Sequence, residues 1–422
     1  MNANRIMIIA DDLTGANDTA IQFVKHGESA LVVTHSMFCE SSIYNDYDIL
    51  SFNADTRAMN PKDAYSEVRN LVKRLNTARL EGLFYKKVDS VLRGNPGPEL
   101  AAVMDELEIP LAIAAPSFPA NRSVLENGIL KSGRAGQSAI NAVSIFADGM
   151  DKKAANIPLN IIRQGCVQAA EYVLTQSKNG VQVFVADAVT DEDLQVISRL
   201  STAVGKPLIF AGAAALANQI AHNMEKKQTE IKQPLLQPCT PALVVAGTRQ
   251  GETAAQIAAL CQTLSAVAIR FKVDLVENGK SEEAIRLAFE EAARFMESKP
   301  ALCVVAVESM FNSQIPEGNV SWNQTDDGAA TAISYALGTL AGKLSEFLRF
   351  QALITTGGDT TLEICKCLGI TGIQPLAEIC PGIPIGKIIG GICEGRYIIT
   401  KSGRFGNKDT LVEIIKYICK GE

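Results

Sequence analysis

Histidine is scarce in this chain, which has three histidines among 422 residues: His26, His35 and His222. His26 precedes Gly27 at a predicted helix end, where a cation suits the helix dipole. His222 lies on a polar helix. We expect all three to be structural or exposed. The scarcity argues against a Ser-His-Asp hydrolase and against a metal site built on histidines.

Two glycine fingerprints are missing as well. The absence of GxGxxG weakens a dinucleotide-binding interpretation, and the absence of GxxxxGK[ST] excludes a P-loop. Gly382–Lys387 comes closest to the second pattern but continues with Ile388. An NAD-dependent hydroxy-acid dehydrogenase, the main enzymatic alternative, would need the first pattern and usually a catalytic His, Lys or Tyr.

Long apolar runs, basic stripes and a disulfide framework are also absent. No uninterrupted apolar stretch reaches the length of a membrane span, and no signal peptide is visible at the N-terminus. The net charge is −6, which argues against nucleic acid as the main partner. The ten cysteines are best interpreted as thiols in a reducing cytosol. We therefore predict a cytoplasmic protein with no membrane or nucleic-acid partner.

What the chain does contain is an alternation of apolar strands and amphipathic helices, with 47% hydrophobic and 20% charged residues. This pattern predicts an α/β protein with mainly parallel sheets. Residues 225–241 carry charge and three prolines without an apolar period, which is typical of a linker. We therefore predict two α/β domains, over residues 1–230 and 240–422, with the active site in the cleft between them.

Two further segments of the chain depart from this alternation. Residues 117–149 are rich in Ser, Asn and Gly, and we expect a long irregular segment there. Near the end of the chain, Ile385–Gly390 and Tyr397–Thr400 predict a hairpin that turns through Glu394 and Gly395.

An acidic run, Ile8–Asp18, is the most informative feature of the first domain. A predicted strand ends in Asp11 and Asp12, a turn follows, and a helix is expected over Asp18–His26. Ligands of open α/β sheets bind beyond the carboxyl ends of the strands. Gathered carboxylates repel one another unless cations offset them, and Lys86–Asn95 supplies such cations after another strand. Together the two runs predict a site for a small, polar anion.

The second domain contains three loops suited to phosphates: Gly247–Gly251, Thr355–Thr361 and Lys401–Lys408. Each follows a predicted strand, and the first two open helices, whose N-termini attract anions. Glycines also let the backbone approach a phosphate closely. The alternatives are a turn capped by Asp359 and a basic surface turn. Three such loops in one domain favour a phosphoryl transferase, with the nucleotide on the second domain and the acceptor on the first.

These motifs, at residues 10–18, 86–95, 357–360 and 401–406, resemble the four-carbon acid sugar kinase family in order and spacing. The resemblance covers nearly the whole chain. It implies ATP, with Mg²⁺, as the phosphoryl donor and the 4-hydroxyl of threonate, erythronate or 2-oxo-tetronate as the acceptor. The form of the first motif favours D-threonate. A homo-oligomer is compatible with the sequence.

The resemblance also implies which residues form the sites. The substrate would contact Asp11, Arg57, Lys87, Val88, Asp89, Ser90 and Arg93. The nucleotide would contact Thr248, Gly357, Gly358, Asp359, Thr360, Gly403 and Gly406. Two positions depart from the family pattern: only Thr248 keeps a hydroxyl in its loop, and Val91 stands where threonine is usual.

The chemistry of a sugar-acid kinase agrees with these residues. Arg57 offers a bidentate fork to a carboxylate, and Lys87 offers a point charge. A carboxylate must accept the proton of the 4-hydroxyl, and Asp12 is the first choice for this base and Asp89 the second. No set of metal ligands is apparent. Outside enzymes, the alternative is a sugar-acid-binding protein, which would need no phosphate loops.

Overall fold

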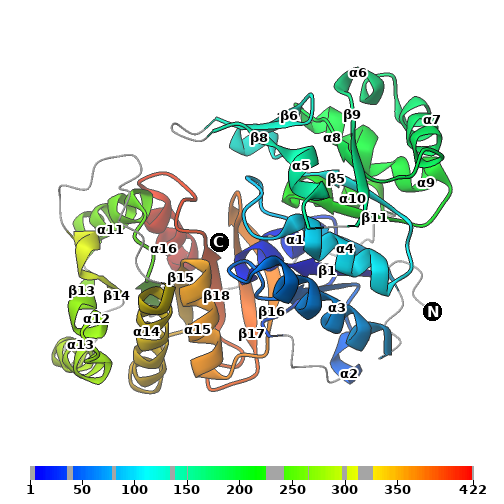
Figure 1. Cartoon of the computed structure of the whole chain (residues 1–422). Helices are drawn as coiled ribbons and strands as arrows, with labels where there is room; N and C mark the ends of the chain where they lie inside the picture. Colours follow the sequence, from blue (N-terminus) through cyan, green and yellow to red (C-terminus); the bar gives the residue numbers. More distant parts are fainter. Residues whose placement is uncertain are drawn as a thin grey trace. The chain divides into compact units, whose positions relative to one another are not determined.

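The computed structural model describes residues 5–35, 41–77, 82–133, 138–149, 151–224, 242–264, 266–296, 302–311 and 327–420. The linker predicted at residues 225–241 lies outside the described residues. The chain divides into two compact units, Met1–Glu230 and Ile231–Glu422. Each unit is an α/β domain, so the predicted fold class is confirmed (Figure 1).

The first unit is built on a parallel sheet whose central strands are mostly buried on both faces. Strands β1, β2, β3 and β5 are buried at every position, as expected for a parallel sheet covered by helices on both sides. In spatial order the strands are β2 (Ala30–Val33), β3 (Ile49–Asn53), β1 (Ile6–Ala10), β4 (Leu83–Lys87), β11 (Leu208–Gly212), β5 (Leu111–Ala115), β10 (Val181–Ala186) and β9 (Lys153–Ile157).

Six of the described helices of the first unit pack in two groups. One group contains α1 (Leu13–Val24), α8 (Asp191–Ser198) and α10 (Ala214–Asn223). The other contains α3 (Pro61–Thr77), α4 (Pro96–Glu106) and α5 (Ala142–Ala147), and Figure 1 shows α3 and α4 side by side. The remaining helices are α2 (Ser41–Tyr44), α6 (Leu159–Ile162), α7 (Cys166–Ser177) and α9 (Leu200–Val204).

The segment expected to be irregular, residues 117–149, contains regular structure. Beside helix α5 it holds the short helix η1 (Pro119–Asn121) and three antiparallel strands, β6 (Ser123–Glu126), β7 (Ile129–Ser132) and β8 (Ile140–Asn141). Asn127 and Gly128 both have positive φ at the β6–β7 turn. The expectation of an irregular segment was wrong because this Asn-Gly pair is a hairpin signal.

The second unit has a mixed sheet. Five parallel strands are followed by two antiparallel ones, in the order β13 (Val267–Phe271), β14 (Leu302–Val307), β12 (Ala242–Ala246), β15 (Ala352–Thr356), β18 (Tyr397–Lys401), β17 (Ile383–Ile389) and β16 (Gly372–Cys380). Strands β17 and β18 form the predicted hairpin. Strand β16, which pairs with β17, was not predicted.

Helices of the second unit also pack in two groups. Helix α14 (Asp327–Leu348) contacts α12 (Val273–Glu277), α13 (Ser281–Met296) and α15 (Gly358–Leu368), while α11 (Gly251–Thr263) contacts α16 (Thr410–Lys420) and η2 (Glu308–Phe311). None of the helices in the described ranges combines the length and apolarity needed to cross a membrane. The described cysteines are all free thiols, as predicted.

Candidate active site

The carboxyl ends of three neighbouring strands, β3, β1 and β4, form one site in the first unit. The chain leaves these strands at Asn53, Ala10 and Lys87. The backbone N–H groups of Thr56 and Arg57 both donate to the carbonyl of Asp11, at 3.1 and 3.3 Å. The loop after β3 is therefore fixed directly over the end of β1, where an open α/β sheet binds its ligands.

Helix α1 begins earlier than the sequence indicated, at Leu13 rather than at Asp18. Asp12 is its N-cap, and its Oδ1 accepts a hydrogen bond from the N–H of Gly15 at 2.7 Å. Asp18 is buried inside the helix. The acids of the run that stand at the end of β1 are therefore Asp11 and Asp12.

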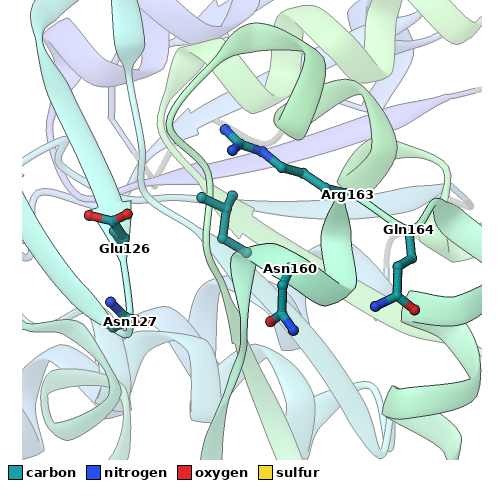
Figure 2. A pocket seen from close by; sticks show the side chains of 6 residues that line it. Glu126, Asn127, Asn160, Arg163 and Gln164 are labelled. Atoms are coloured by element: carbon teal, nitrogen blue, oxygen red, sulfur yellow. The ribbon is translucent and has the colours of Figure 1, made fainter.

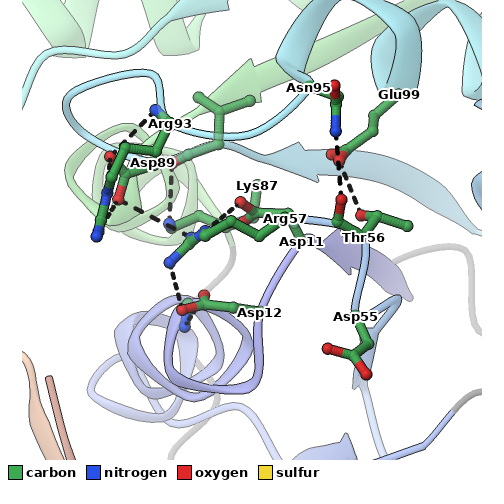
Figure 3. Close-up of polar contacts among 12 residues, drawn as sticks. Asp11, Asp12, Asp55, Thr56, Arg57, Lys87, Asp89, Arg93, Asn95 and Glu99 are labelled. Carbon is green, nitrogen blue, oxygen red and sulfur yellow. Dashed lines mark hydrogen bonds and ion pairs between the residues drawn. The ribbon is translucent and has the colours of Figure 1, made fainter. Parts of the chain in front are cut away.

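Arg57 joins the carboxylates of the site, as Figure 3 shows. Its Nε and Nη2 donate to the two oxygens of Asp11 at 2.6 and 2.9 Å, and its Nη1 donates to Oδ2 of Asp12 at 2.5 Å. Its Nη2 also lies 3.9 Å from Oδ1 of Asp89. The guanidinium is thus engaged by the protein's own acids, and a ligand carboxylate would share it with them.

The cations of the site keep Asp11 ionised. Burial alone would raise the pKa of Asp11, but the Arg57 guanidinium, helped by Lys86 and Lys87, holds that pKa below its ordinary value. The carboxylates in return raise the pKa of Arg57 well above its usual range, despite the burial of its guanidinium. Asp11 therefore stays ionised and Arg57 stays protonated at neutral pH.

Asp89 is held by the loop that follows β4. Its carboxylate accepts from Nε and Nη2 of Arg93 at 3.1 and 2.6 Å and from the N–H of Val91 at 3.1 Å. Burial works against ionisation, but Arg93 and Arg57 bring the pKa of Asp89 far below its ordinary value. A carboxylate that is so strongly stabilised in its charged form is a poor proton acceptor.

Glu99 also belongs to the site, although it was not predicted from the sequence. It lies in the first turn of α4, buried, and its Oε2 pairs with Nζ of fully buried Lys86 at 2.7 Å. The Thr56 hydroxyl donates to its other oxygen at 2.8 Å, and burial raises the pKa of Glu99, with Lys86 opposing. Lys86 is thus a cation beneath the site, not one that faces a ligand.

Lys87 lies next to the cap of α1. Its Nζ donates to the carbonyl of Val88 at 2.8 Å. A methyl group added at Gly15 would lie 2.6 Å from Oδ1 of Asp12 and 3.1 Å from Nζ of Lys87, so Gly15 provides the space that these two charged groups share. The Val88 side chain is buried, and the Ser90 carbonyl accepts a hydrogen bond from the Ser123 hydroxyl at 2.6 Å.

In the second unit, the three predicted phosphate loops follow β12, β15 and β18, which are neighbours in the sheet. Two of their glycines, Gly247 and Gly403, lie too close to neighbouring loops for a side chain. A Cβ at Gly247 would overlap the Thr360 hydroxyl, and a Cβ at Gly403 would overlap the Thr248 hydroxyl. Arg404 also donates from Nε to Oε1 of Gln250 at 3.0 Å. Thr248, Gly357, Thr360 and Gly403, which were assigned to the nucleotide from the sequence, thus lie together.

The N-terminus of α15 lacks a side-chain cap. Gly357, with φ of 100°, is the N-cap, so the alternative in which Asp359 caps this helix is wrong. Asp359 is exposed in the first turn, next to Gly358. Helix α11 also has no side-chain cap at Gln250. At both helix N-termini the N-cap residue thus makes no side-chain capping bond, which suits an anion site.

Not every polar group of these loops is available to a ligand. The Thr361 hydroxyl donates to the Gly357 carbonyl at 2.7 Å, and its oxygen lies 2.9 Å from the Thr355 hydroxyl oxygen. Gly406, with φ of 85°, abuts Thr410 at the start of α16 and serves a local turn. In the described residues, no group of three or more His, Cys, Asp or Glu side chains is arranged to hold a metal ion.

A separate pocket of about 570 Å³ lies elsewhere in the first unit, shown in Figure 2. None of the site residues predicted from the sequence lines it. Its Arg163 is bound to Asp193 by two hydrogen bonds of 3.0 and 3.3 Å, so the guanidinium is already paired. The other lining residues are Glu126, Asn127, Leu159, Asn160 and Gln164.

Comparison with known proteins agrees with the division of roles between the units. Residues 6–220 match the model of a sugar-binding N-terminal domain, and residues 243–411 match that of a nucleotide-binding C-terminal domain. A D-threonate kinase from Bordetella bronchiseptica is 28% identical, covering 99% of this chain and 98% of its own. A D-erythronate kinase from Heliobacterium modesticaldum is 25% identical, covering 98% and 97%. Further relatives are 3-oxo-tetronate kinases.

A solved structure of a Salmonella typhimurium LT2 protein shares the fold, with a TM-score of 0.76 and 19% sequence identity. The match covers 98% of this chain and 99% of that chain. At this identity the likeness shows the fold alone.

Proposed function

Because the chain belongs to the four-carbon acid sugar kinase family, a family of phosphotransferases, we propose that it phosphorylates the 4-hydroxyl of D-threonate with ATP. D-threonate kinases are among the relatives that match nearly the full length of the chain. The observation that carries the proposal is the cluster of Arg57 with Asp11 and Asp12 at the ends of β1 and β3. It offers charge and hydrogen-bond acceptors for a small polyhydroxy anion.

In this proposal the first unit binds the sugar acid. Arg57 and Lys87 attract the substrate carboxylate, and acidic oxygens accept hydrogen bonds from its hydroxyls. Asp12 is the candidate base because its side chain is 18% exposed, against 3% for Asp11. Asp89 is less suited to this role because Arg93 stabilises its ionised form. We assign Asp89 and Arg93 to positioning the substrate.

The second unit is proposed to bind ATP. The uncapped N-termini of α11 and α15 and the packed glycines at residues 247, 357 and 403 fit a polyphosphate. Mg²⁺ would neutralise phosphate charge, held mainly by the phosphates and water, since the described residues contain no carboxylate cluster for it.

An ADP-release assay over D- and L-threonate, D- and L-erythronate and 3-oxo-tetronate tests the substrate. We expect the highest kcat/KM with D-threonate. The oxo acid of the panel is the 3-oxo compound because relatives are named for it, and not for the 2-oxo acid that the sequence analysis considered. Highest activity with D-erythronate would move the assignment to that acid, and no ADP release with any of the five would overturn it.

We predict that Gly403→Ala weakens ATP binding. The added Cβ would overlap the Thr248 side chain and separate two of the three loops. Overpacking of this kind costs about 1–3 kcal/mol, so Kd for ATP should rise roughly 5- to 100-fold. Isothermal titration calorimetry measures it. The double variant with Thr248→Gly, which removes the obstructing side chain, should bind ATP better than Gly403→Ala alone. A Kd for ATP in Gly403→Ala equal to that of the wild-type protein would contradict the prediction.

A further inference from the structure

Lys401, the last residue of β18, is fully buried beneath the loop at residues 402–407. Its Nζ donates to the carbonyls of Ser402 at 2.8 Å and Phe405 at 3.2 Å, and to the Thr253 hydroxyl at 3.4 Å. No acidic side chain in the described part of the chain lies within ion-pair distance of this ammonium. Its partners are therefore the neutral oxygens of the loop and of α11.

Helix α11 holds the same loop from the side. The Thr253 hydroxyl donates to the Gly403 carbonyl at 2.7 Å. Nε2 of Gln256 donates to the carbonyls of Phe405 and Asn407, both at 2.9 Å. Together with Lys401, these donors turn four loop carbonyls toward the protein interior. The N–H groups of Phe405 and Asn407 are used locally, by the Ser402 carbonyl at 3.1 Å and the Thr410 hydroxyl at 2.9 Å. With its carbonyls turned inward, the loop can present the N–H groups of Gly403 and Arg404 outward, which is the arrangement of an anion-binding concavity.

The electrostatics of Lys401 indicate a purpose beyond packing. Burying an ammonium without a carboxylate is unfavourable, whereas an apolar side chain would fill the same space without this cost. Burial lowers the pKa of Lys401 to about 7, with Glu252 of α11 acting in the opposite direction. An anion bound on the outer side of the loop would supply the missing negative charge.

We propose that Lys401 is a positioning residue for the nucleotide. Lys401 holds the loop at residues 402–407 in its phosphate-binding shape, and its positive charge favours the binding of an anion on the outer side of this loop. This inference rests on the proposed function, because it takes the ligand of the second unit to be ATP. It assigns a role to a residue that does not itself contact the nucleotide.

The test is Lys401→Met, which keeps an unbranched side chain in the buried space and removes the charge and the donors. Calorimetric titration should show Kd for ATP raised about tenfold or more, with the Kd for the sugar acid unchanged. In steady-state assays KM for ATP should rise while KM for the sugar acid stays constant. Lys343→Met, an exposed lysine of α14, is the matched control and should leave both constants unchanged.

Thr253→Val is the second variant, because it keeps the β-branched shape and removes only the hydroxyl that donates to Gly403. We expect a smaller rise in Kd for ATP in this variant. If Lys401→Met does not fold, Thr253→Val provides the test instead. A folded Thr253→Val variant with wild-type affinity for ATP would then overturn the proposal. Wild-type ATP affinity in folded Lys401→Met would also overturn it. Failure of the wild-type protein to bind ATP would instead refute the proposed function.

Discussion

Asp12→Asn is expected to lower kcat by about 100-fold or more, while Kd for the sugar acid stays within about tenfold. Asparagine caps helices as well as aspartate does, so the amide oxygen can still accept from the Gly15 N–H and α1 should keep its start. What the amide cannot do is accept the proton of the 4-hydroxyl. Steady-state kinetics combined with calorimetric binding of the sugar acid separates the two effects.

Asp11→Asn and Asp89→Asn are the matched controls for this experiment. Each removes one carboxylate from the same cluster, and neither should lower kcat as much as Asp12→Asn. A larger kcat loss in Asp89→Asn, with binding intact, would make Asp89 the base and Asp12 a positioning acceptor. If kcat is unchanged in all three variants, a binding role becomes the better account of this site.

The second large effect is expected from Arg57→Ala, which should lower kcat/KM for the sugar acid roughly 30- to 1000-fold, mainly through KM. The substitution removes the guanidinium that binds Asp11 and Asp12 and faces Asp89. The remaining carboxylates would then repel the anionic substrate. KM for ATP should change little, and Arg69→Ala, which removes an exposed arginine paired with Glu106, should change neither constant. Unchanged sugar-acid kinetics in Arg57→Ala would refute the assignment.

Arg57→Ala should also shift the pH profile of kcat/KM, in a direction that follows from the structure. Arg57 lowers the pKa of Asp11 and of Asp89, so its removal raises both values. If the ionised carboxylates are needed for activity, the acid limb of kcat/KM will shift to higher pH in the variant.

Much of the fold could be predicted from the sequence because its signals are local. The buried strands of a parallel sheet are short apolar runs, and the residues that follow them gather at one edge. This is why the runs that contain Asp11 and Asp89 could be predicted to form one site from the strand pattern, whereas Arg57 was assigned to it from the family resemblance. The antiparallel hairpin of β17 and β18 was predicted from another local signal, the turn at Glu394 and Gly395 between two apolar runs. Strand β16 was missed because its pairing with β17 shifts register between Pro375 and Ala377 and again between Glu378 and Cys380, so no clean alternation remains.

The start of α1 and the role of Glu99 could not be predicted because they depend on tertiary contacts. Gly15 was interpreted as a turn residue, but it lies in the first turn of α1, where a side chain would meet Asp12 and Lys87. Glu99 is one of many acids at predicted helix starts. Only the packing of α4 against the sheet brings it to Lys86. Local pattern identifies which strand ends form the site, whereas the partners of each charge follow from the three-dimensional packing.

The Lys86–Glu99 pair also constrains how this enzyme can evolve. Loss of either residue alone leaves the other as an uncompensated charge in the interior, which typically destabilises a protein by about 3–5 kcal/mol. Exchange of both for apolar residues of similar size can be neutral. The two positions therefore have no easy path of single substitutions between the charged and the apolar state.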